Sequence, residues 1–480
     1  MNSPSPAVKT IVVCGGGLAG HMATLSLVNA LGSDHHIAQV NASATPPADD
    51  IYGGATSPES YNFLRGLGLD EPLLMLAGRA SFSLGTHFRR WRPGQTWHQC
   101  HHAPFPTIDG TPLIHHLTRS RTPLSEVLIS AQAALAGRFA HPPADPANPL
   151  ALAEYGYQFD PLDWVRLLDA RIETTRVERL KAETITVQSQ VAGRTVLALD
   201  DDIALEADLI IDATGPARTV ISQTGSHFIA DRTVNARISR QAATQIGQPS
   251  RVIEASEEGW TLKVFPQETE LSLAITSPAE PNETLKGFDV ELGRVSEAWQ
   301  GNCIAIGHAA WTIEPLTPAP MMLLQRDIER LLELIPTTAE ANTERREYNR
   351  RFRDDVDHAG LFHEALLRQE GAMNSAYWKS AAGGEPSEKL ARKLRQYGHR
   401  GIVPRYDLEP FNNEDWIILL EGLGKTPQDY DRQADRLPEA ETQNQLRQMK
   451  ATIDNLIPRM PPHHIYVAKL KQYLEKKRHV

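Results

Sequence analysis

The first regular segment of the chain reads TIVVCGGGLAGHMATLSLV at residues 10–28, and this stretch decides the fold. Residues 11–13 are β-branched and predict a buried strand, which three consecutive glycines follow. From Leu18 onward the spacing of apolar residues is typical of a helix. A strand, a glycine turn and a helix in this order open a dinucleotide-binding βαβ unit. We therefore expect a second strand near residues 37–40.

The glycines of the pattern Gly15-x-Gly17-x-x-Gly20 each have a steric role. Gly15 permits the tight turn, Gly17 lets the backbone approach a pyrophosphate, and Gly20 lets the helix pack close to the sheet. The first helical residues, Leu18 and Ala19, would present free N–H groups to the phosphates. Because the pattern follows a predicted strand and opens a predicted helix, it predicts a nucleotide site.

The end of the second predicted strand departs from the usual pattern of this fold. An acidic residue is expected there to hold the ribose hydroxyls, but the sequence HHIAQVNAS places Asn41 at that position. An asparagine side chain still bonds a hydroxyl, although without the assistance of charge. We therefore keep Asn41 among the nucleotide contacts and expect weaker binding.

The composition narrows the range of partners. The chain has 480 residues and a formal net charge of -10, so nucleic acid and anionic membranes are poor candidate partners. No apolar run reaches the roughly 18 to 20 residues of a transmembrane helix, and the first residues lack a signal-peptide pattern. The three scattered cysteines, Cys14, Cys100 and Cys303, argue against a disulfide framework. We therefore expect a cytoplasmic protein.

The chain changes character near residue 320. Before it, four segments read as strands: residues 207–215, 260–265, 271–275 and 301–311. Beyond it, charged helical stretches punctuated by prolines dominate. We therefore predict an α/β fold in two parts. Residues 1–320 form a Rossmann-like domain with an inserted β-sheet region, and residues 321–480 form a helical lobe.

Several segments resemble known flavoproteins. IDATGPAR at residues 211–218 is similar to the second FAD-contacting strand end of glutathione-reductase-type flavoproteins. GNCIAIGHAAWTIEPL at residues 301–316 and IYGGATSPESYNFLRGLGLDE at residues 51–71 resemble the GDAA-and-EPL block and the GEAT loop of flavin-dependent tryptophan halogenases. Four later segments look like that family's C-terminal landmarks: EYNRR at 347–351, NSAYW at 374–378, EDWIILLEGLGKTPQDYD at 414–431 and MPPHHIY at 460–466.

The resemblance implies a cofactor, a substrate class and a partner. It implies FAD in a glutathione-reductase-type FAD-binding domain with a mixed β-sheet and a helical lobe over the substrate. It also implies a small aromatic substrate and reduced flavin from a separate flavin reductase, and it leaves a homodimer open. Besides the glycine loop and Asn41, the residues that match the family's cofactor contacts are Ala55, Thr56, Asp212, Gly215, Gly307 and His308.

The residues that handle halide in this family are replaced. Ser83 stands at the position of the catalytic lysine, and Thr317 stands at the position of the catalytic glutamate. Neither side chain can act as a cationic donor or as a carboxylate base, so the catalytic residues are unknown. The next residues of the family offer backbone N–H groups to chloride. Here they are Pro318, Ala319 and Pro320, and proline has no N–H.

Further family positions differ as well. The WxWxIP signature reads WTLKVF here and keeps only its first tryptophan, Trp260. Gly54 and His308 replace two acidic residues that would contact the cofactor. His308 is interpreted either as a cofactor contact or as an acid/base group. Tyr377 and Trp378, like Trp416, either stack on an aromatic substrate or pack between helices, whereas Trp260 is carried over as a substrate contact.

A histidine-rich patch invites a metal site. It comprises His98, Cys100, His101 and His102, with His87 nearby in sequence. The spacing matches no zinc signature, and adjacent histidines of a strand point to opposite faces. We therefore predict no metal and a structural or substrate-lining role.

Three functions stay open from the sequence. The first is an FAD-dependent oxidoreductase of the monooxygenase type that acts on an indole or another aromatic substrate. The second is an active halogenase with displaced residues, in which Lys263 could replace the missing lysine. The third is a non-catalytic member of the family that binds flavin or a metabolite.

Overall fold

The computed structural model describes residues 7–42, 48–92, 95–191, 194–200, 203–278, 287–338, 341–368 and 375–478. Two parts of the sequence discussed above lie outside the described residues. They are the N-terminal residues 1–6 and Asn374 of the NSAYW segment.

The glycine-rich stretch forms the βαβ unit that its sequence predicts, in a six-stranded sheet with the order β19-β20-β13-β1-β2-β9. The strands are β1 (Thr10–Cys14), β2 (His36–Ala42), β9 (Glu178–Ala182), β13 (Leu209–Asp212), β19 (Trp299–Gln300) and β20 (Cys303–Ala305). Neighbouring strands are parallel, except that β19 runs antiparallel to β20. Helix α1 (Leu18–Ala30) packs against α6 (Pro161–Ile172) and α7 (Ala319–Glu333).

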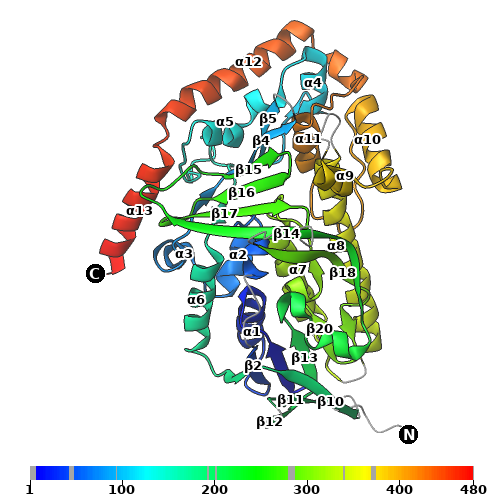
Figure 1. Ribbon diagram of the computed structural model, residues 1–480. Coiled ribbons are helices and arrows are strands. Elements are labelled where there is room, and N and C mark those ends of the chain that lie inside the picture. Colours follow the sequence, from blue (N-terminus) through cyan, green and yellow to red (C-terminus); the bar gives the residue numbers. More distant parts are fainter. Residues whose placement is uncertain are drawn as a thin grey trace.

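A second, eight-stranded sheet lies above the first in Figure 1 and has the order β21-β18-β14-β17-β16-β15-β4-β5. Its strands are β4 (Gly85–Arg92), β5 (Gln95–Cys100), β14 (Phe228–Ala242), β15 (Arg251–Ser256), β16 (Gly259–Val264), β17 (Thr269–Thr276), β18 (Phe288–Val295) and β21 (Trp311–Thr312). Only the contact between β15 and β4 is parallel. The predicted strand pair is therefore present as β16 and β17, which pair antiparallel.

Smaller sheets and short helices connect these two layers. The antiparallel sheet β10 (Ile185–Val191), β11 (Arg194–Leu199) and β12 (Ile203–Ala207) lies at the end of the first sheet. The two-stranded sheets are β3 (Ser81–Ser83) with β8 (Gly156–Gln158) and β6 (Thr107–Ile108) with β7 (Thr111–Pro112). The connecting helices are the 3₁₀ helices η1 (Ala48–Tyr52) and η2 (Leu124–Val127), and α2 (Ser60–Gly66), α3 (Glu71–Leu76), α4 (Leu113–Ser120) and α5 (Ile129–Leu135).

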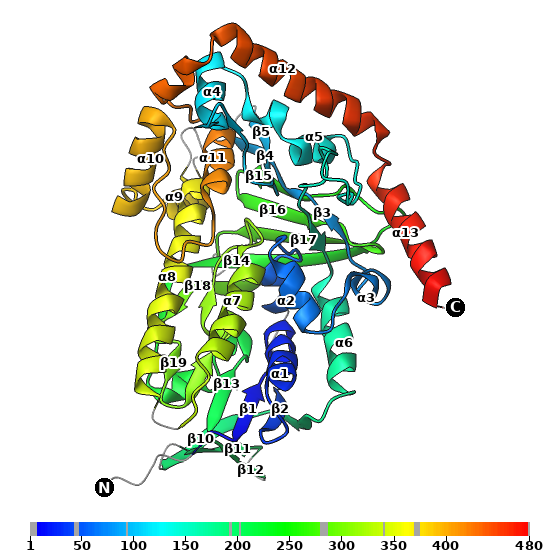
Figure 2. The same cartoon turned by 180° about the vertical axis from the view of Figure 1, so that it is seen from behind.

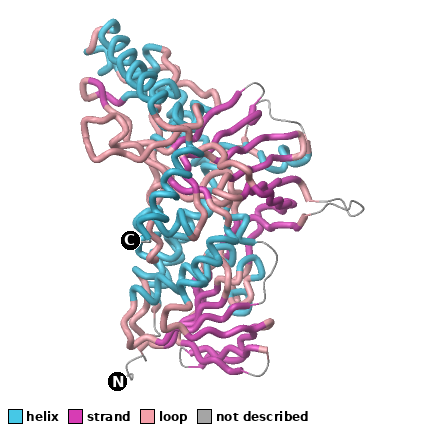
Figure 3. The backbone as a smooth tube through the Cα atoms, turned by 90° about the vertical axis from the view of Figure 1, so that its left-hand side faces the viewer, coloured by secondary structure: helices cyan, strands magenta, loops and turns pink. Residues whose placement is uncertain are grey.

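The last third of the chain is helical, as its composition predicts. After α7 the helices are α8 (Asn342–Leu367), α9 (Ala376–Ala382), α10 (Glu388–Arg400), α11 (Asn413–Gly422), α12 (Glu439–Leu456) and α13 (His463–Arg478). Figure 2 shows α7 and α8 beside α1, and α12 crossing the far end of the molecule. In Figure 3 most strands lie on one side of the molecule and most helices on the other.

Two hydrophobic cores hold these layers. One surrounds the parallel sheet and the helices α1, α6 and α7, and the other lies between the eight-stranded sheet and the helices α4, α9, α10 and α11. The predicted fold class is confirmed: an α/β, glutathione-reductase-type domain with a mixed sheet and a C-terminal helical region. Helix α7 begins at Ala319, and the division of the chain into two domains at residue 320 stays a prediction.

Two further features concern the cysteines and the hydrophobicity of the helices. Cys14, Cys100 and Cys303 are buried and free. Among the described residues, no helix combines the length and the apolar character needed to cross a membrane.

Candidate functional site

The glycine loop has the shape that its sequence predicts. Gly15 has a φ of +139°, and a Cβ there would lie 2.3 Å from the carbonyl oxygen of Ala213. A Cβ on Gly20 would lie 2.3 Å from the carbonyl oxygen of Gly15. Neither position has room for a side chain, because β1, β13 and α1 approach one another closely. The backbone thus forms a nucleotide-type turn.

An acidic side chain occupies the helix end that this turn presents. The backbone N–H of Leu18 donates to Oδ1 of Asp49 at 3.2 Å. A Cβ on Gly17 would lie 2.7 Å from Oδ2 of the same carboxylate. Burial raises the pKa of Asp49 to about 6, although the bond from Leu18 opposes this rise. Asp49 therefore lies where the fold places a phosphate, at the N-terminus of α1.

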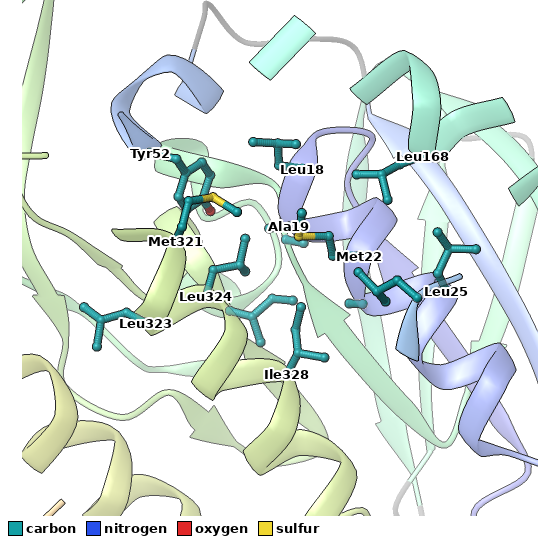
Figure 4. Close-up of a cluster of buried hydrophobic side chains, with 14 of the residues drawn as sticks. Leu18, Ala19, Met22, Leu25, Tyr52, Leu168, Met321, Leu323, Leu324 and Ile328 are labelled. Atoms are coloured by element: carbon teal, nitrogen blue, oxygen red, sulfur yellow. The ribbon is translucent and has the colours of Figure 1, made fainter. Parts of the chain in front are cut away.

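A tyrosine fills the next part of the same cleft. The ring of Tyr52 stacks on His308 with centroids 3.9 Å apart, and its hydroxyl accepts the backbone N–H of His308 at 3.2 Å. A Cβ on Gly307 would lie 2.2 Å from the Tyr52 hydroxyl and 3.1 Å from Cβ of Ala19. Figure 4 shows Tyr52 beside Met321, in the cluster of side chains where α1 packs on α7. We call the region between the glycine loop at Gly15 and the turn at Gly307 the cofactor cradle.

The polar groups expected at the strand ends are engaged within the chain. The carboxylate of Asp212 accepts the N–H groups of Thr214, Val220 and Ile221 at 2.7 to 3.0 Å. Gly215 begins the short turn that these bonds stabilise, with a φ of +70°. Asn41 lies beside Gly16, whose Cβ would be 3.1 Å from its Oδ1. Asp212 therefore has its acceptors used, whereas Oδ1 of Asn41 has no partner among the described residues.

The turn at Gly307 is held by a residue that no sequence motif indicates. Asp327 of α7 accepts the N–H of Gly307 at 2.9 Å and the indole N–H of Trp311 at 2.7 Å, and it pairs with Arg330 at 3.0 Å. Burial raises the pKa of Asp327 to about 6. Burial lowers the pKa of His308 to about 4, so its ring is neutral at pH 7.

The loop that contains Gly54, Ala55 and Thr56 is tied to the rest of the site by Arg251. This guanidinium is fully buried and donates to the carbonyl oxygens of Gly53 at 3.3 Å, Pro315 at 3.2 Å and Leu316 at 3.3 Å, and to the hydroxyl of Thr86 at 2.9 Å. Burial lowers its pKa to about 9.

The two predicted cofactor contacts of this loop pack on β8. Thr56 accepts the N–H of Tyr157 at 3.0 Å, and Ala55 forms a bridge with Gln158. Both side chains are buried against that strand.

The two positions at which the resemblance places catalytic residues carry hydroxyl groups. The hydroxyl of Ser83 is buried and bonds the backbone of Gly85 at 3.3 Å. The hydroxyl of Thr317 lies 2.9 Å from Nε2 of His363 and accepts the N–H of Ala319 at 3.2 Å. Ala319 is the only residue of the run 318–320 with an N–H, so this run has no free N–H group left for a halide.

The predicted substrate aromatics lie in the core. The indole N–H of Trp260 and the hydroxyl of Tyr377 both bond Oε1 of Glu314, at 3.2 and 2.5 Å, and Glu314 also pairs with Arg232. Trp378 donates to the carbonyl oxygen of Ser256 at 2.8 Å. Trp260, Tyr377 and Trp378 are each at most 3% exposed. This placement matches the core-packing interpretation.

Lys263 lies on the other face of β16. Along this strand Trp260, Leu262 and Val264 are buried, whereas Lys263 is exposed and pairs with Glu270 at 2.7 Å. Its ammonium group thus points away from Trp260.

An empty space remains next to Thr317. A cavity of about 80 Å³ between Thr317, His101 and Phe411 adjoins a second cavity of about 440 Å³. Both are lined by Pro58, Glu59, His102, Glu154 and Asn412. We call the two together the Thr317 pocket.

The Thr317 pocket is acidic. Burial raises the pKa of Glu59 and of Glu154, and repulsion between them adds to the rise at Glu154. His102 pairs with Asp415 at 3.3 Å; burial opposes protonation, but this carboxylate raises the pKa of the ring above its usual value. Burial lowers the pKa of His101 to about 3, which leaves that ring neutral.

The histidine-rich patch divides into two pairs, and the adjacent His101 and His102 lie beyond the end of β5 rather than on opposite faces of a strand. His87 and His98 stack on each other with centroids 4.3 Å apart, and burial lowers their pKa values to about 4 and about 3. His101 and His102 line the Thr317 pocket. Within the described ranges, no group of three or more potential ligands is arranged to hold a metal ion.

Comparison with known proteins decides the family. The family model described as tryptophan halogenase matches residues 10–439. The chain belongs to the tryptophan halogenase family.

Its similarity to individual members of the family is distant but extends along the chain. It is 24% identical over 490 aligned residues to tryptophan 6-halogenase SttH of Streptomyces toxytricini, covering 88% of this chain and 90% of that protein. The fold is that of BrvH, a flavin-dependent halogenase from Brevundimonas sp. BAL3, with a TM-score of 0.87, 23% identity and coverage of 96% and 99%. Xcc4156, a flavin-dependent halogenase from Xanthomonas campestris, gives a TM-score of 0.86 at 23% identity, with coverage of 97% and 98%.

The family implies FAD, yet the residues present do not fit this cofactor in the described conformation. The backbone of the glycine loop suits a pyrophosphate, but the carboxylate of Asp49 lies on its N–H groups. Tyr52 and Ala19 lie within contact distance of the Cβ position at Gly307. In the described conformation Asp49 thus takes one N–H at the end of α1, and Tyr52 packs on the turn at Gly307.

Sequence reasoning missed the residues that fill the cradle. Asp49 and Tyr52 belong to the stretch ADDIY, which reads as an ordinary polar turn before the GGAT loop. Only the three-dimensional contacts of Asp49 with α1 and of Tyr52 with Gly307 reveal their place.

Proposed function

We propose that this member of the tryptophan halogenase family binds a small molecule and neither halogenates nor turns over flavin. The observation that carries this proposal is the occupation of the cofactor cradle by Asp49 and Tyr52. The Thr317 pocket is the part of the family's site that stays available to a ligand.

Electrostatics supports this proposal at the pyrophosphate end. A helix N-terminus attracts one anionic group through its free N–H groups and its dipole. Here the carboxylate of Asp49 already accepts the N–H of Leu18. A pyrophosphate brought to the same place would displace this bond and meet a like charge in a poorly solvated position.

Packing supports it at the other end of the cradle. The polar chain between the pyrophosphate and the flavin ring needs hydrogen-bond partners. Instead, Tyr52, Ala19 and Leu324 converge on Gly307, and the hydroxyl of Tyr52 takes the N–H of His308. Buried polar groups without partners are costly, so these apolar contacts oppose the cofactor.

The halide chemistry lacks its groups as well. Ser83 and Thr317 supply hydroxyls in place of a lysine and a glutamate, and the N–H of Ala319 is donated to Thr317. Losing single groups of this kind commonly costs orders of magnitude in rate.

The ligand that we expect in the Thr317 pocket is aromatic and neutral or cationic. The pocket combines Tyr61, Tyr155 and Phe411 with the carboxylates of Glu59 and Glu154. An anionic ligand would meet repulsion there, whereas an aromatic ring finds apolar walls.

Titration of the purified protein with FAD tests the proposal. Flavin fluorescence quenching should show no binding below about 100 μM, and the protein should purify colourless. SttH, measured in the same buffer, is the positive control. A yellow preparation, or a Kd for FAD below about 10 μM, would contradict the proposal.

A monooxygenase fed with reduced FAD by a separate flavin reductase is the second candidate. It is favoured by the retained backbone of the glycine loop at Gly15 and Gly20. It requires Asp49 and Tyr52 to leave the cradle. Products of a reaction with FAD, NADH, a flavin reductase, chloride or bromide and a panel of indoles decide the matter: an oxygenated product supports this candidate, and a chlorinated or brominated one contradicts both.

Two statements about the setting of the protein remain proposals. We propose a cytoplasmic location, which the three free buried cysteines support. The homodimer and the two-domain division at residue 320 stay predictions, which a mass measurement in solution and limited proteolysis would check.

A further inference from the structure

A cavity of about 830 Å³ lies away from the cofactor cradle and from the Thr317 pocket. Its walls are α4, the 3₁₀ helix η2, α5 and the C-terminal end of α11, and its floor is residues 96–98 of β5. These elements lie together at the upper end of Figure 1, below α12. We call it the α4–α11 cavity. It is as large as sites that hold small organic ligands.

The lining of the α4–α11 cavity combines aliphatic and polar side chains. Leu117, Leu124, Ile114 and Ile418 line it, and each is at most 5% exposed to solvent. Leu128 adds a further side chain at 8% exposure. Such a surface binds the hydrocarbon part of a ligand and releases water from it.

A carboxyl group lies on one wall of the α4–α11 cavity. Glu421, at the C-terminal end of α11, accepts the backbone N–H of Leu124 at 3.1 and 3.2 Å with its two oxygens. Burial raises the pKa of Glu421 to about 7. A carboxylate has more acceptor positions than this single N–H can use, so it can accept further hydrogen bonds from a ligand.

The floor carries two polar ring atoms without partners. Nδ1 of His98 is buried and has no hydrogen-bond partner among the described residues, and the whole residue is 7% exposed. Its Nε2 lies 3.3 Å from the hydroxyl of Ser250. The indole N–H of Trp97 is likewise buried without a partner, and its ring packs against the backbone of Gly422. Unpaired buried polar groups of this kind call for a ligand or water.

The cations at the edge of the cavity do not neutralise Glu421. The guanidinium of Arg119 donates to the carbonyl oxygens of Ala434 and Leu437 and pairs with Asp435. Arg121 is exposed to solvent, which screens its charge. His98 is neutral because burial lowers its pKa to about 3.

We propose that the α4–α11 cavity binds a hydrophobic amine, whose ammonium group bonds the carboxylate of Glu421 and whose hydrocarbon body lies among Leu117, Leu124 and Ile418. An ammonium group supplies the donors that Glu421 can accept. The inference is independent of the proposed function, because it uses none of the residues of the cradle or of the Thr317 pocket.

Calorimetric titration with a matched pair of probes tests this proposal. Cyclohexylmethylamine carries the ammonium group, and cyclohexylmethanol has the same hydrocarbon body with a neutral head. The full-length protein should bind the amine with a Kd on the order of 1 mM or tighter, and at least fivefold more tightly than the alcohol. Equal affinity for the two probes, or no binding of the amine, would overturn the proposal.

Three variants locate the binding. Glu421→Gln keeps the shape of the side chain and an acceptor for Leu124, and it should weaken the amine by about tenfold while sparing the alcohol. Thr118→Phe, which fills the cavity from α4, should weaken both probes. Glu154→Gln changes the other acidic pocket, and it should leave the affinity of the α4–α11 cavity for both probes unchanged. Loss of amine binding in Glu154→Gln with full binding in Glu421→Gln would assign the amine to the other pocket and overturn the proposal.

Discussion

The cofactor cradle and the Thr317 pocket belong to one site, but they differ in what occupies them. Side chains of the chain itself lie in the cradle, whereas the Thr317 pocket is open. In the cradle, Asp49 and Tyr52 take the hydrogen-bond donors and the space that a dinucleotide would use. In the Thr317 pocket, Glu59, Glu154 and His102 line a cavity that is still open. The two regions depend on different side chains, so the fit to a cofactor and the presence of a pocket can change separately.

Arg251 links the two regions. Its guanidinium bonds Gly53 of the loop beside the cradle and Pro315 and Leu316 of the segment that leads to Thr317. This buried guanidinium therefore fixes the position of the cradle relative to the Thr317 pocket.

Arg251→Ala should give the largest loss of stability, about 3–5 kcal/mol in the free energy of unfolding. The substitution leaves three buried carbonyl oxygens without donors and removes the packing of a fully buried side chain. Urea unfolding followed by circular dichroism measures this loss. Arg166→Ala, at an exposed arginine, is the control and should change stability by less than about 0.5 kcal/mol. A loss below about 1 kcal/mol for Arg251→Ala would mean that the link is absent.

Gly307→Ala should cost about 2–4 kcal/mol, because a Cβ there lies 2.2 Å from the hydroxyl of Tyr52 and φ is +56°. Tyr52→Phe removes that hydroxyl. In the Tyr52→Phe background the cost of Gly307→Ala should fall by about 1 kcal/mol or more. The four proteins form a double-mutant cycle, measured by urea unfolding. An identical cost in both backgrounds would show that Tyr52 does not fill the cradle in solution.

The sequence predicts the backbone of the cradle but not what fills it. Gly15 and Gly20 are recognisable because local steric demands select glycine at fixed spacing, and the fold follows from that pattern. Asp49 and Tyr52 act through contacts with residues far away in the chain, and nothing in the letters ADDIY specifies those contacts. Local patterns predict local shape, whereas the filling of a cleft depends on tertiary packing.

The aromatic residues show the same limit of prediction from sequence. Tyr377 had two interpretations in sequence, as a substrate contact or as part of the core. Its burial on Glu314 with Trp260 is decided by the path of α9 over the eight-stranded sheet. The replacement of the family's lysine and glutamate by Ser83 and Thr317 stays a prediction, which rests on the comparison of motif positions in the sequence.

Asp49→Asn should stabilise the protein at pH 7 by about 1–2 kcal/mol. The pKa of Asp49 in the folded protein, about 6, lies above its usual value of 3.8, so this group favours folding below pH 3.8 and loses that contribution as the pH rises through 6. An asparagine oxygen still accepts the N–H of Leu18 without this loss.

The gain of Asp49→Asn over the wild type should therefore grow between pH 4 and pH 7, as measured by urea unfolding at each pH. The raised pKa of Asp327 cancels in this difference, because both proteins contain it, whereas repulsion from Asp50 is itself one cause of the raised pKa of Asp49. Asp34→Asn, at an exposed carboxylate, is the matched control. A gain that does not change with pH would place Asp49 in solvent and leave the cradle open.

His102→Gln should have the smallest effect and should act in a different pH window. The bond to Asp415 holds the pKa of His102 above its usual value of 6.5, even though burial opposes protonation. The pair therefore stabilises the fold fully below pH 6.5, and this contribution disappears as the pH rises through the raised pKa. At pH 6 the wild type should exceed His102→Gln by about 0.5–1 kcal/mol more than it does at pH 9. With Asp49 titrating between pH 4 and 6, the filled and the open regions then separate into two steps of one stability profile. A difference between the wild type and His102→Gln that stays constant from pH 6 to pH 9 would show that His102 carries no charge in the open pocket.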